Sequence, residues 1–281
     1  MDARDWIGRS ETKSDTVTPA PYAALSATLD WPVTRPPAGT PIPPLWHWLY
    51  FLPCPPQAEI GPDGHAARGG FLPPIPLPRR MWAGSELDFH APIAIGDAIT
   101  RSSVIESITE KAGRSGRLVF VRVRHAIRRQ GEPDPVLTEF HDVVYREAAR
   151  PEDAAATPKP APASSRWERR IVPDPVLLFR YSALTFNGHR IHYDRRYVTE
   201  VEGYPGLVVH GPLIATLLLD LLRRELPDAR VARFEFRAMR PLYDLDAFHV
   251  CGDPAEGGRT VHLWARDPGG SVAMDGTATI A

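Results

Sequence analysis

Hydrophobic and polar residues alternate along much of the chain, which is the pattern of half-buried β-strands. In the first half, three such runs lie between Glu86 and Tyr145, separated by glycine-containing turns. In the second half, four runs lie between Arg230 and Ala281, with Gly-Asp and Asp-Pro-Gly-Gly turns among them. The pattern therefore predicts two antiparallel meanders.

One segment of the second half departs from this alternation. Residues 211–226, GPLIATLLLDLLRREL, carry leucine or isoleucine on nearly every face and predict a buried helix. Pro212 fits a first-turn position, and Arg223 and Arg224 lie where cations suit the helix dipole. An antiparallel sheet after such a helix can wrap it and keep its outer face in water. We expect this arrangement, a hot dog, in the second half.

The first half repeats the arrangement loosely, with residues 44–51, PLWHWLYF, as a short aromatic counterpart of the helix. Residues 146–167 are rich in alanine, proline and charge, which is typical of a connector. We therefore predict an α+β double hot-dog, with two antiparallel sheets that each wrap a central helix. Its parts are an N-terminal domain over residues 1–148, a linker over 149–167 and a C-terminal domain over 168–281.

Composition narrows the class of protein. The 281 residues, 43% of them hydrophobic, can fill two cores. A net charge of -1 offers no field for nucleic acid or an anionic membrane. Cys54 and Cys251 have no paired spacing, so a reducing setting fits. With no signal-like or membrane-length apolar run, we expect a cytoplasmic protein with neither nucleic acid nor membrane as a partner.

The chemistry-bearing residues gather in residues 179–194, FRYSALTFNGHRIHYD. Asn187 and His192 are five apart, and the turn around Gly188 could aim both into one cleft. The segment resembles the hydratase motif of MaoC-like hot-dog enzymes, Asp-x-Asn-Pro-x-His, commonly followed by x-Asp. The histidine matches, whereas Asn187 stands in place of the aspartate and Arg190 in place of the proline.

The first half carries further resemblance, to the dehydratase module that precedes a MaoC-like domain in fused enzymes. Its markers are DWIGR at 5–9, ATLD at 27–30, GGFLPP at 69–74, RMWAG at 80–84 and FHAP at 89–92. Together they look similar to 3-methylfumaryl-CoA (mesaconyl-C4-CoA) hydratases and mitochondrial 3-hydroxyacyl-thioester dehydratases. The resemblance implies reversible hydration of a trans-2-enoyl thioester without metal or redox cofactor, at one site in the C-terminal half.

This chemistry needs a base for water, a proton for the α carbon and donors for the enolate oxygen. His192 is our candidate base, and Gly211 at the helix N-terminus is the candidate oxyanion donor. Asn187 cannot exchange a proton and would orient the water, or else simply serve the turn. The second proton carrier stays open between His189, Asp194 and His192 itself, and we favour His192 alone.

Candidate substrate contacts come from cationic and imidazole side chains. Arg190 would pair with an anionic acyl tail or a CoA phosphate, which favours a dicarboxylic substrate. The remaining candidates are His189, His210, Arg180, Arg237 and Arg240. A metal on His189 and His192 is not predicted, because no third ligand has convincing spacing and Arg190 would repel a cation.

The leading hypothesis is a hydro-lyase that hydrates a short, branched dicarboxylic enoyl-CoA such as 3-methylfumaryl-CoA. One alternative is dehydration of 3-hydroxyacyl groups on acyl carrier protein, and another is a thioester-binding module without catalysis. Because the edges of such sheets often pair between subunits, a homodimer is a further hypothesis.

Overall fold

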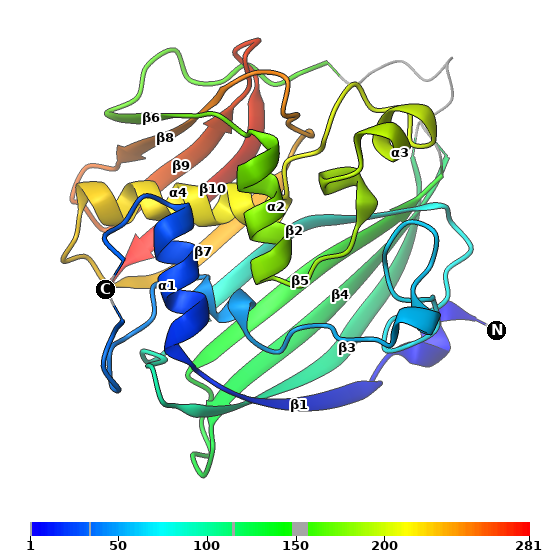
Figure 1. Cartoon of the computed structure of the whole chain (residues 1–281), viewed down its shortest axis with the longest axis horizontal. Coiled ribbons are helices and arrows are strands. Elements are labelled where there is room, and N and C mark those ends of the chain that lie inside the picture. The colour runs from blue at the N-terminus through cyan, green and yellow to red at the C-terminus, as the bar shows by residue number, and fades with distance from the viewer. Residues whose placement is uncertain (1, 34, 114–115, 148–156) are drawn as a thin grey trace.

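A single antiparallel sheet forms the body of the protein (Figure 1). The computed structural model describes residues 2–33, 35–113, 116–147 and 157–281. The ten strands of the sheet are β1 (Ser10–Thr16), β2 (Arg79–Phe89), β3 (Ala98–Gly113), β4 (Gly116–Arg129), β5 (Leu137–Arg146), β6 (Trp167–Ile171), β7 (Val231–Ala238), β8 (Phe248–Pro254), β9 (Thr260–Arg266) and β10 (Val272–Ile280).

The two halves of the chain join within this sheet. Its order is β1-β3-β4-β5-β2-β7-β10-β9-β8-β6, so the first five strands come from the first half and the others from the second. The junction is the antiparallel pairing of β2 with β7, from Gly84 opposite Arg237 to Asp88 opposite Arg233. The two predicted sheets are therefore one continuous sheet, with β1 and β6 as its edges.

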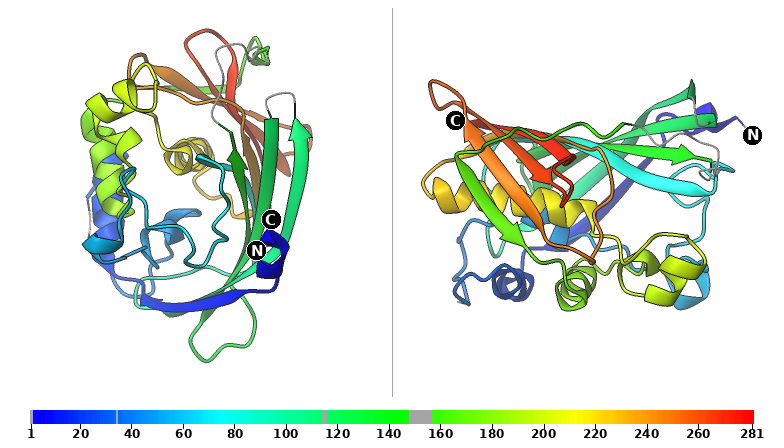
Figure 2. Two further views of the ribbon diagram at one scale, coloured as in Figure 1. Left: turned by 90° about the vertical axis from the view of Figure 1, so that its right-hand side faces the viewer. Right: turned by 90° about the horizontal axis from the view of Figure 1, so that it is seen from above.

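The α-helices lie on one side of the sheet (Figure 2). They are α1 (Pro19–Thr28), α2 (Pro175–Leu184), α3 (Arg195–Glu200) and α4 (Gly211–Glu225). The 3-10 helices in the described residues are η1 (Ala3–Trp6), η2 (Trp46–Leu49), η3 (Gln57–Glu59) and η4 (Arg190–His192). In Figure 2, α4 lies between the sheet and the layer formed by α1, α2 and α3. The polar site described below lies where this outer layer meets the N-terminus of α4.

The central helix α4 confirms the sequence prediction to within one residue at its end. Every side chain from Leu213 to Leu222 is buried, and Pro212 occupies the first turn, where its missing amide hydrogen costs no helical bond. The first half has no helix of this length in the described residues. Its predicted counterpart forms only η2, so the expectation of a central helix in each half is corrected to one long helix.

The predicted connector lies partly outside the described residues, which omit residues 148–156. Strand β6 begins at Trp167, the last residue assigned to the linker, and pairs with β8. The domain boundaries themselves stay a prediction, as does the homodimer. None of the helices in the described ranges is long and apolar enough to cross a membrane.

Candidate active site

His192 ends η4 in the segment that links α2 to α3. Its side chain is buried, and Nδ1 lies 2.7 Å from the carbonyl oxygen of Val208. Since a carbonyl only accepts, Nδ1 donates and Nε2 keeps its lone pair. Burial lowers the pKa of His192 to about 4, so the ring is neutral near pH 7. Nε2 of His192 is therefore equipped to accept a proton.

The ring of His210 packs against the ring of His192. The two imidazoles stack with centroids 3.7 Å apart and planes 17° apart. His210 is fully buried at the N-cap of α4, and its Nε2 lies 2.7 Å from Oγ of Ser182 on α2. Burial also holds the pKa of His210 well below its usual range. These contacts favour a positioning role over the substrate contact predicted for His210.

Asn187 follows the C-terminus of α2, where the chain turns into the site. Phe186 has a φ of 48°, and Oδ1 of Asn187 accepts the backbone N–H of His189 at 3.0 Å. The turn role considered for Asn187 is thus present. It leaves the amide nitrogen as a donor, which is compatible with the water-orienting role as well.

Arg190 is held by neighbours rather than directed at an open space. Its Nε and one terminal nitrogen bind the Asp194 carboxylate at 3.0 and 2.7 Å, and the other terminal nitrogen donates to the Pro62 carbonyl at 2.9 Å. The guanidinium also lies 4.1 Å from the Tyr197 ring centroid. Asp194 in turn caps α3 by accepting the N–H of Tyr197. This pairing argues against Arg190 as the substrate cation and against Asp194 as a proton carrier.

A loop of the first half, residues 60–67, packs directly on this segment. The backbone N–H of Arg190 donates to the Asp63 carbonyl at 2.9 Å. Gly64 has a φ of 87°, and a Cβ there would overlap the carbonyl of Gly188. Only glycine combines that backbone conformation with so close an approach. The 60–67 loop is thus fitted against the hydratase-like turn.

The loop brings an acid and an imidazole to the site. Asp63 Oδ2 lies 3.1 Å from Nδ1 of His65, and Asp63 Oδ1 accepts the His65 backbone N–H at 3.0 Å. The hydrogen bond from His65 keeps the pKa of Asp63 well below its usual range. The His65 ring centroid is 3.9 Å from that of His189, which is 5.4 Å from that of His192. The rings of His65, His189 and His192 therefore lie in a row.

His189, between the other two rings, also has a lowered pKa. Burial first, and then the nearby His65, lower its pKa to about 2. Arg80 of β2 contributes in the same direction through its charge. Arg80 also stands opposite Tyr145 in the sheet and offsets part of the rise that burial causes in the pKa of that phenol. A half-buried guanidinium from the first half thus approaches the site.

The N-terminus of α4 forms the other side of the site. Gly211 faces Trp82 of β2, whose ring would lie 3.5 Å from a Cβ at position 211. Trp82 donates its indole N–H to Ser85 Oγ at 3.2 Å. A helix N-terminus beside the buried His192 offers free amides to a developing negative charge, which is consistent with the predicted oxyanion role of Gly211.

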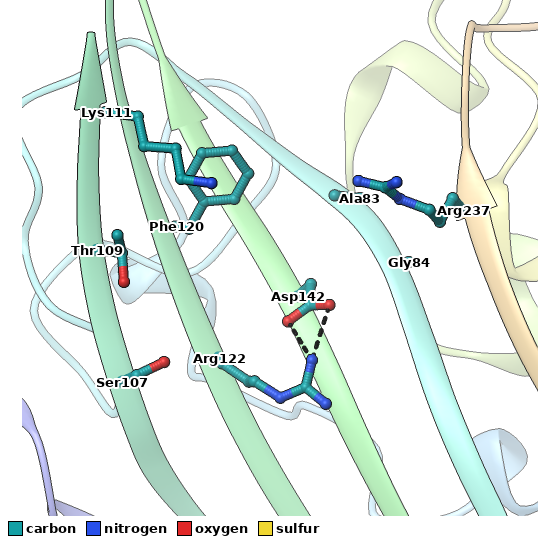
Figure 3. Close-up of a pocket in the computed structure, with 9 residues that line it drawn as sticks. All are labelled: Ala83, Gly84, Ser107, Thr109, Lys111, Phe120, Arg122, Asp142 and Arg237. Atoms are coloured by element: carbon teal, nitrogen blue, oxygen red, sulfur yellow. Dashed lines mark hydrogen bonds and ion pairs between the residues drawn. The ribbon is translucent and has the colours of Figure 1, made fainter.

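The other predicted arginines lie elsewhere. Arg180 is exposed on α2, and Arg240 forms an ion pair with Asp267 at 2.6 Å. Arg237 lines a cavity of about 260 Å³ with Lys111 and Arg122, on strands of the sheet (Figure 3). The structure therefore does not bring Arg180, Arg237 or Arg240 into contact with His192.

A larger, mainly apolar cavity of about 390 Å³ lies along the second half of α4. Side chains of both halves line it, including Ile42, Trp46, Phe89, Leu219 and Leu222. Thr216, one turn after Pro212, lies on its wall. The cavity thus begins about one helical turn from the candidate oxyanion donor.

The sequence interpretation missed Asp63, His65 and Arg80. A Gly-Pro-Asp-Gly-His run at residues 61–65 is a turn signal that holds both an acid and a histidine. That run indicates a tight turn, but nothing in it indicates a neighbour more than 120 residues away. Asp63, His65 and His189 also offer three ligand atoms within 4.8 Å of one another, which is a candidate metal cluster among the described residues.

We expect the protein to lose stability as the pH falls below about 6.5. Burial lowers the pKa of His192 to about 4 and that of His125, beside His141 and Glu139, to about 3. Both histidines are neutral in the folded protein but gain a proton in the unfolded chain. Between pH 6.5 and about 4, each therefore lowers the free energy of unfolding by about 1 kcal/mol per pH unit. Urea unfolding at pH 7.5 and 5.5 measures the loss.

The variant His125→Gln should lose less stability between those two pH values than the native chain. His90→Gln changes an exposed histidine and serves as its control. An equal loss in the His125→Gln variant and the native chain would contradict the assignment of this pH dependence to buried neutral histidines.

Known proteins resemble this chain along nearly its whole length. The family model described as hydroxyacyl-thioester dehydratase type 2 matches residues 45–244. The chain is 47% identical to mesaconyl-C(4)-CoA hydratase of Chloroflexus aurantiacus, over 98% of this chain and 96% of that protein. It is 28% identical to the mitochondrial hydroxyacyl-thioester dehydratase type 2 of Schizosaccharomyces pombe, over 84% and 88% of the two chains.

Solved structures share the fold. A MaoC-like dehydratase from Phytophthora capsici superposes with a TM-score of 0.71 and 14% identity, covering 100% of this chain and 98% of that one. At this identity the likeness shows the fold alone. It confirms the prediction of a hot-dog architecture.

Proposed function

Because the chain belongs to the hydroxyacyl-thioester dehydratase type 2 family, we propose that it reversibly adds water to a short trans-2-enoyl-CoA and forms the 3-hydroxyacyl-CoA. The observation that carries this proposal is the neutral His192, whose Nδ1 is held by the Val208 carbonyl so that Nε2 is the acceptor. It lies beside the N-terminus of α4, where an oxyanion is favoured.

Each site residue has a separate role in the proposed hydration. Nε2 of His192 removes a proton from water while the water oxygen bonds to the β carbon, with Asn187 orienting the water. The π electrons of the double bond move toward the thioester carbonyl, and the enolate oxygen is stabilised by the amide of Gly211. A proton then bonds to the α carbon. These steps are proton transfers and one carbon–oxygen bond formation, so we propose no redox cofactor.

For the acyl group we propose 3-methylfumaryl-CoA, that is, mesaconyl-C4-CoA, the substrate in the name of the 47% identical relative. A dicarboxylic substrate needs a cation near the acyl end. Arg190 is paired with Asp194, so we assign this role to Arg80. Its charge acts on both His189 and Tyr145, which supports a position at the edge of the site.

The variant Arg80→Gln should raise KM for 3-methylfumaryl-CoA by about 10- to 100-fold, since a charge-assisted hydrogen bond contributes about 1.5–3 kcal/mol. The KM for crotonyl-CoA, which lacks the second carboxylate, should change less than about threefold. The measurement is a panel of enoyl-CoAs with products followed by mass. Arg196→Gln, at an exposed position on α3, is the matched control. Equal losses on both substrates would exclude carboxylate recognition by Arg80.

The apolar cavity along α4 favours a second candidate, the dehydration of 3-hydroxyacyl groups with longer monocarboxylic chains, carried on CoA or acyl carrier protein. The same panel separates the two when it includes a medium-chain trans-2-enoyl-CoA. Preference for the medium chain would support this candidate over the dicarboxylic one. No water addition to any member would support the thioester-binding module instead.

A further inference from the structure

We propose that His65, held by Asp63, is the second proton carrier of this site, the one that delivers the proton to the α carbon. This inference rests on the proposed hydration of an enoyl-CoA. It assigns a catalytic residue to the 60–67 loop of the first half, so that both halves of the chain complete one site.

The need for a second carrier comes from the hydratase-like turn itself. At position 187 the turn carries an amide, whose nitrogen donates but does not transfer a proton at neutral pH. The carboxylate of Asp194 is bound by Arg190 and caps α3. Neither Asn187 nor Asp194 is therefore placed to exchange a proton with the substrate. Burial lowers the pKa of His189, the other candidate on this segment, to about 2, so its ring carries no second proton to give near pH 7.

The 60–67 loop supplies a group that can transfer a proton, which the turn lacks. Nδ1 of His65 lies 3.1 Å from the Asp63 carboxylate, which accepts the Nδ1 proton and leaves Nε2 as the atom that can exchange a proton with a substrate. The pair has the arrangement in which a carboxylate orients an imidazole for proton transfer. An imidazole oriented in this way can give a proton and recover it.

His65 is more exposed than the two stacked imidazoles, His192 and His210. Its side chain is 28% exposed, whereas His192 and His210 are buried. Such access allows solvent to return a proton to His65 after each turnover. His65 also lies near enough to His192 to contribute to the fall in that residue's pKa, through the intervening His189.

The close packing of the 60–67 loop on the hydratase-like turn fixes the position of His65. The Arg190 amide and guanidinium bind the carbonyls of Asp63 and Pro62, and Gly64 meets Gly188 at a distance no larger residue allows. In the forward reaction His192 accepts the proton that water loses, and His65 gives one proton to the α carbon. Transfer of a proton from His192 to solvent and from solvent to His65 restores both groups, so the net reaction adds one water.

The test compares His65→Gln, Asp63→Asn and His65→Ala with the native chain, using the enoyl-CoA that the native chain hydrates fastest. We expect His65→Gln to lower kcat by about 100-fold or more with KM changed less than about threefold, because general acid catalysis contributes about 10²–10⁴-fold. Asp63→Asn keeps an acceptor for the loop and removes the charge, so its kcat should fall by about tenfold. Added imidazole should restore part of the activity of His65→Ala, which repair of a structural defect would not do.

The outcomes are separable. If the native chain hydrates no enoyl-CoA, the proposed function fails. If it does so while His65→Gln keeps kcat within about threefold, only the role of His65 fails. His90→Gln is the matched histidine control, and thermal melting of each variant reports folding. If His65→Gln does not fold, the Asp63→Asn variant and imidazole rescue of His65→Ala decide.

A divalent cation is the rival occupant, since Asp63, His65 and His189 hold three ligand atoms within 4.8 Å. The native chain is therefore also assayed after dialysis against EDTA and after addition of Zn²⁺. Activity that is lost with EDTA and restored by Zn²⁺ would overturn the proton-carrier assignment, while activity unchanged by EDTA would support it.

Discussion

Replacing His192 with alanine is expected to lower kcat by about 10²–10⁴-fold, the usual contribution of a general base. The variant removes the imidazole whose Nε2 would accept the proton of water, while the Val208 carbonyl loses only one hydrogen bond. The decay of the ultraviolet absorbance of the enoyl thioester measures the rate. The product is confirmed by mass.

The control for this experiment is His249→Ala, a histidine of β8 that contacts Glu168 and lies outside the site. Both variants should melt within a few degrees of the native chain, which separates loss of chemistry from loss of fold. A His192→Ala variant that keeps more than about a tenth of the native kcat would remove His192 from the mechanism.

Replacing Asp220 with alanine is expected to lower the free energy of unfolding by about 3–5 kcal/mol, the cost of breaking a buried ion pair on one side. The carboxylate of Asp220, on α4, is 2% exposed. It accepts from Trp31 Nε1 at 2.6 Å, from Arg169 of β6 at 2.7 Å and from Arg224 at 2.8 Å. Removal of this acceptor leaves three partly buried donors without it. Urea unfolding at pH 7.5 measures the change.

The exposed Asp228 offers the matched control, because Asp228→Ala removes the same charge just after the same helix. It should change the free energy of unfolding by less than about 0.5 kcal/mol. Equal effects of the two substitutions would show that the contacts of Asp220 with both halves contribute no more than a surface charge.

Local pattern predicted the second half of the fold well. Strands β7 to β10 occupy the four alternating runs, and α4 occupies the apolar segment. The strand β1, with the sequence SETKSDT, was missed because it is an edge strand with mostly polar side chains and so has no apolar period. The first half of β2 was missed as well, since the predicted run began only at Glu86.

The site also contains residues that local pattern predicted and contacts that it missed. His192, Asn187 and Gly211 lie in short segments whose turn and helix signals are local. In the structure His192 stacks on His210, the residue before Gly211, and Asn187 lies in the turn that precedes His192. Arg190 was interpreted as a substrate contact, although the structure pairs it with Asp194, four residues later. Its other partner, the Pro62 carbonyl, lies in the other half of the chain. A sequence pattern gives no sign of such a partner.

The sequence by itself determined the strand periodicity, the buried helix and the hydratase-like turn, because each depends on spacing along the chain. Only the tertiary structure decided that the two halves share one sheet through β2 and β7 and that the 60–67 loop lies on the turn. It also decided the protonation of His192, since burial and the Val208 carbonyl set its pKa and its tautomer. Desolvation and close backbone approach arise between distant segments, so they exist only once the chain has folded.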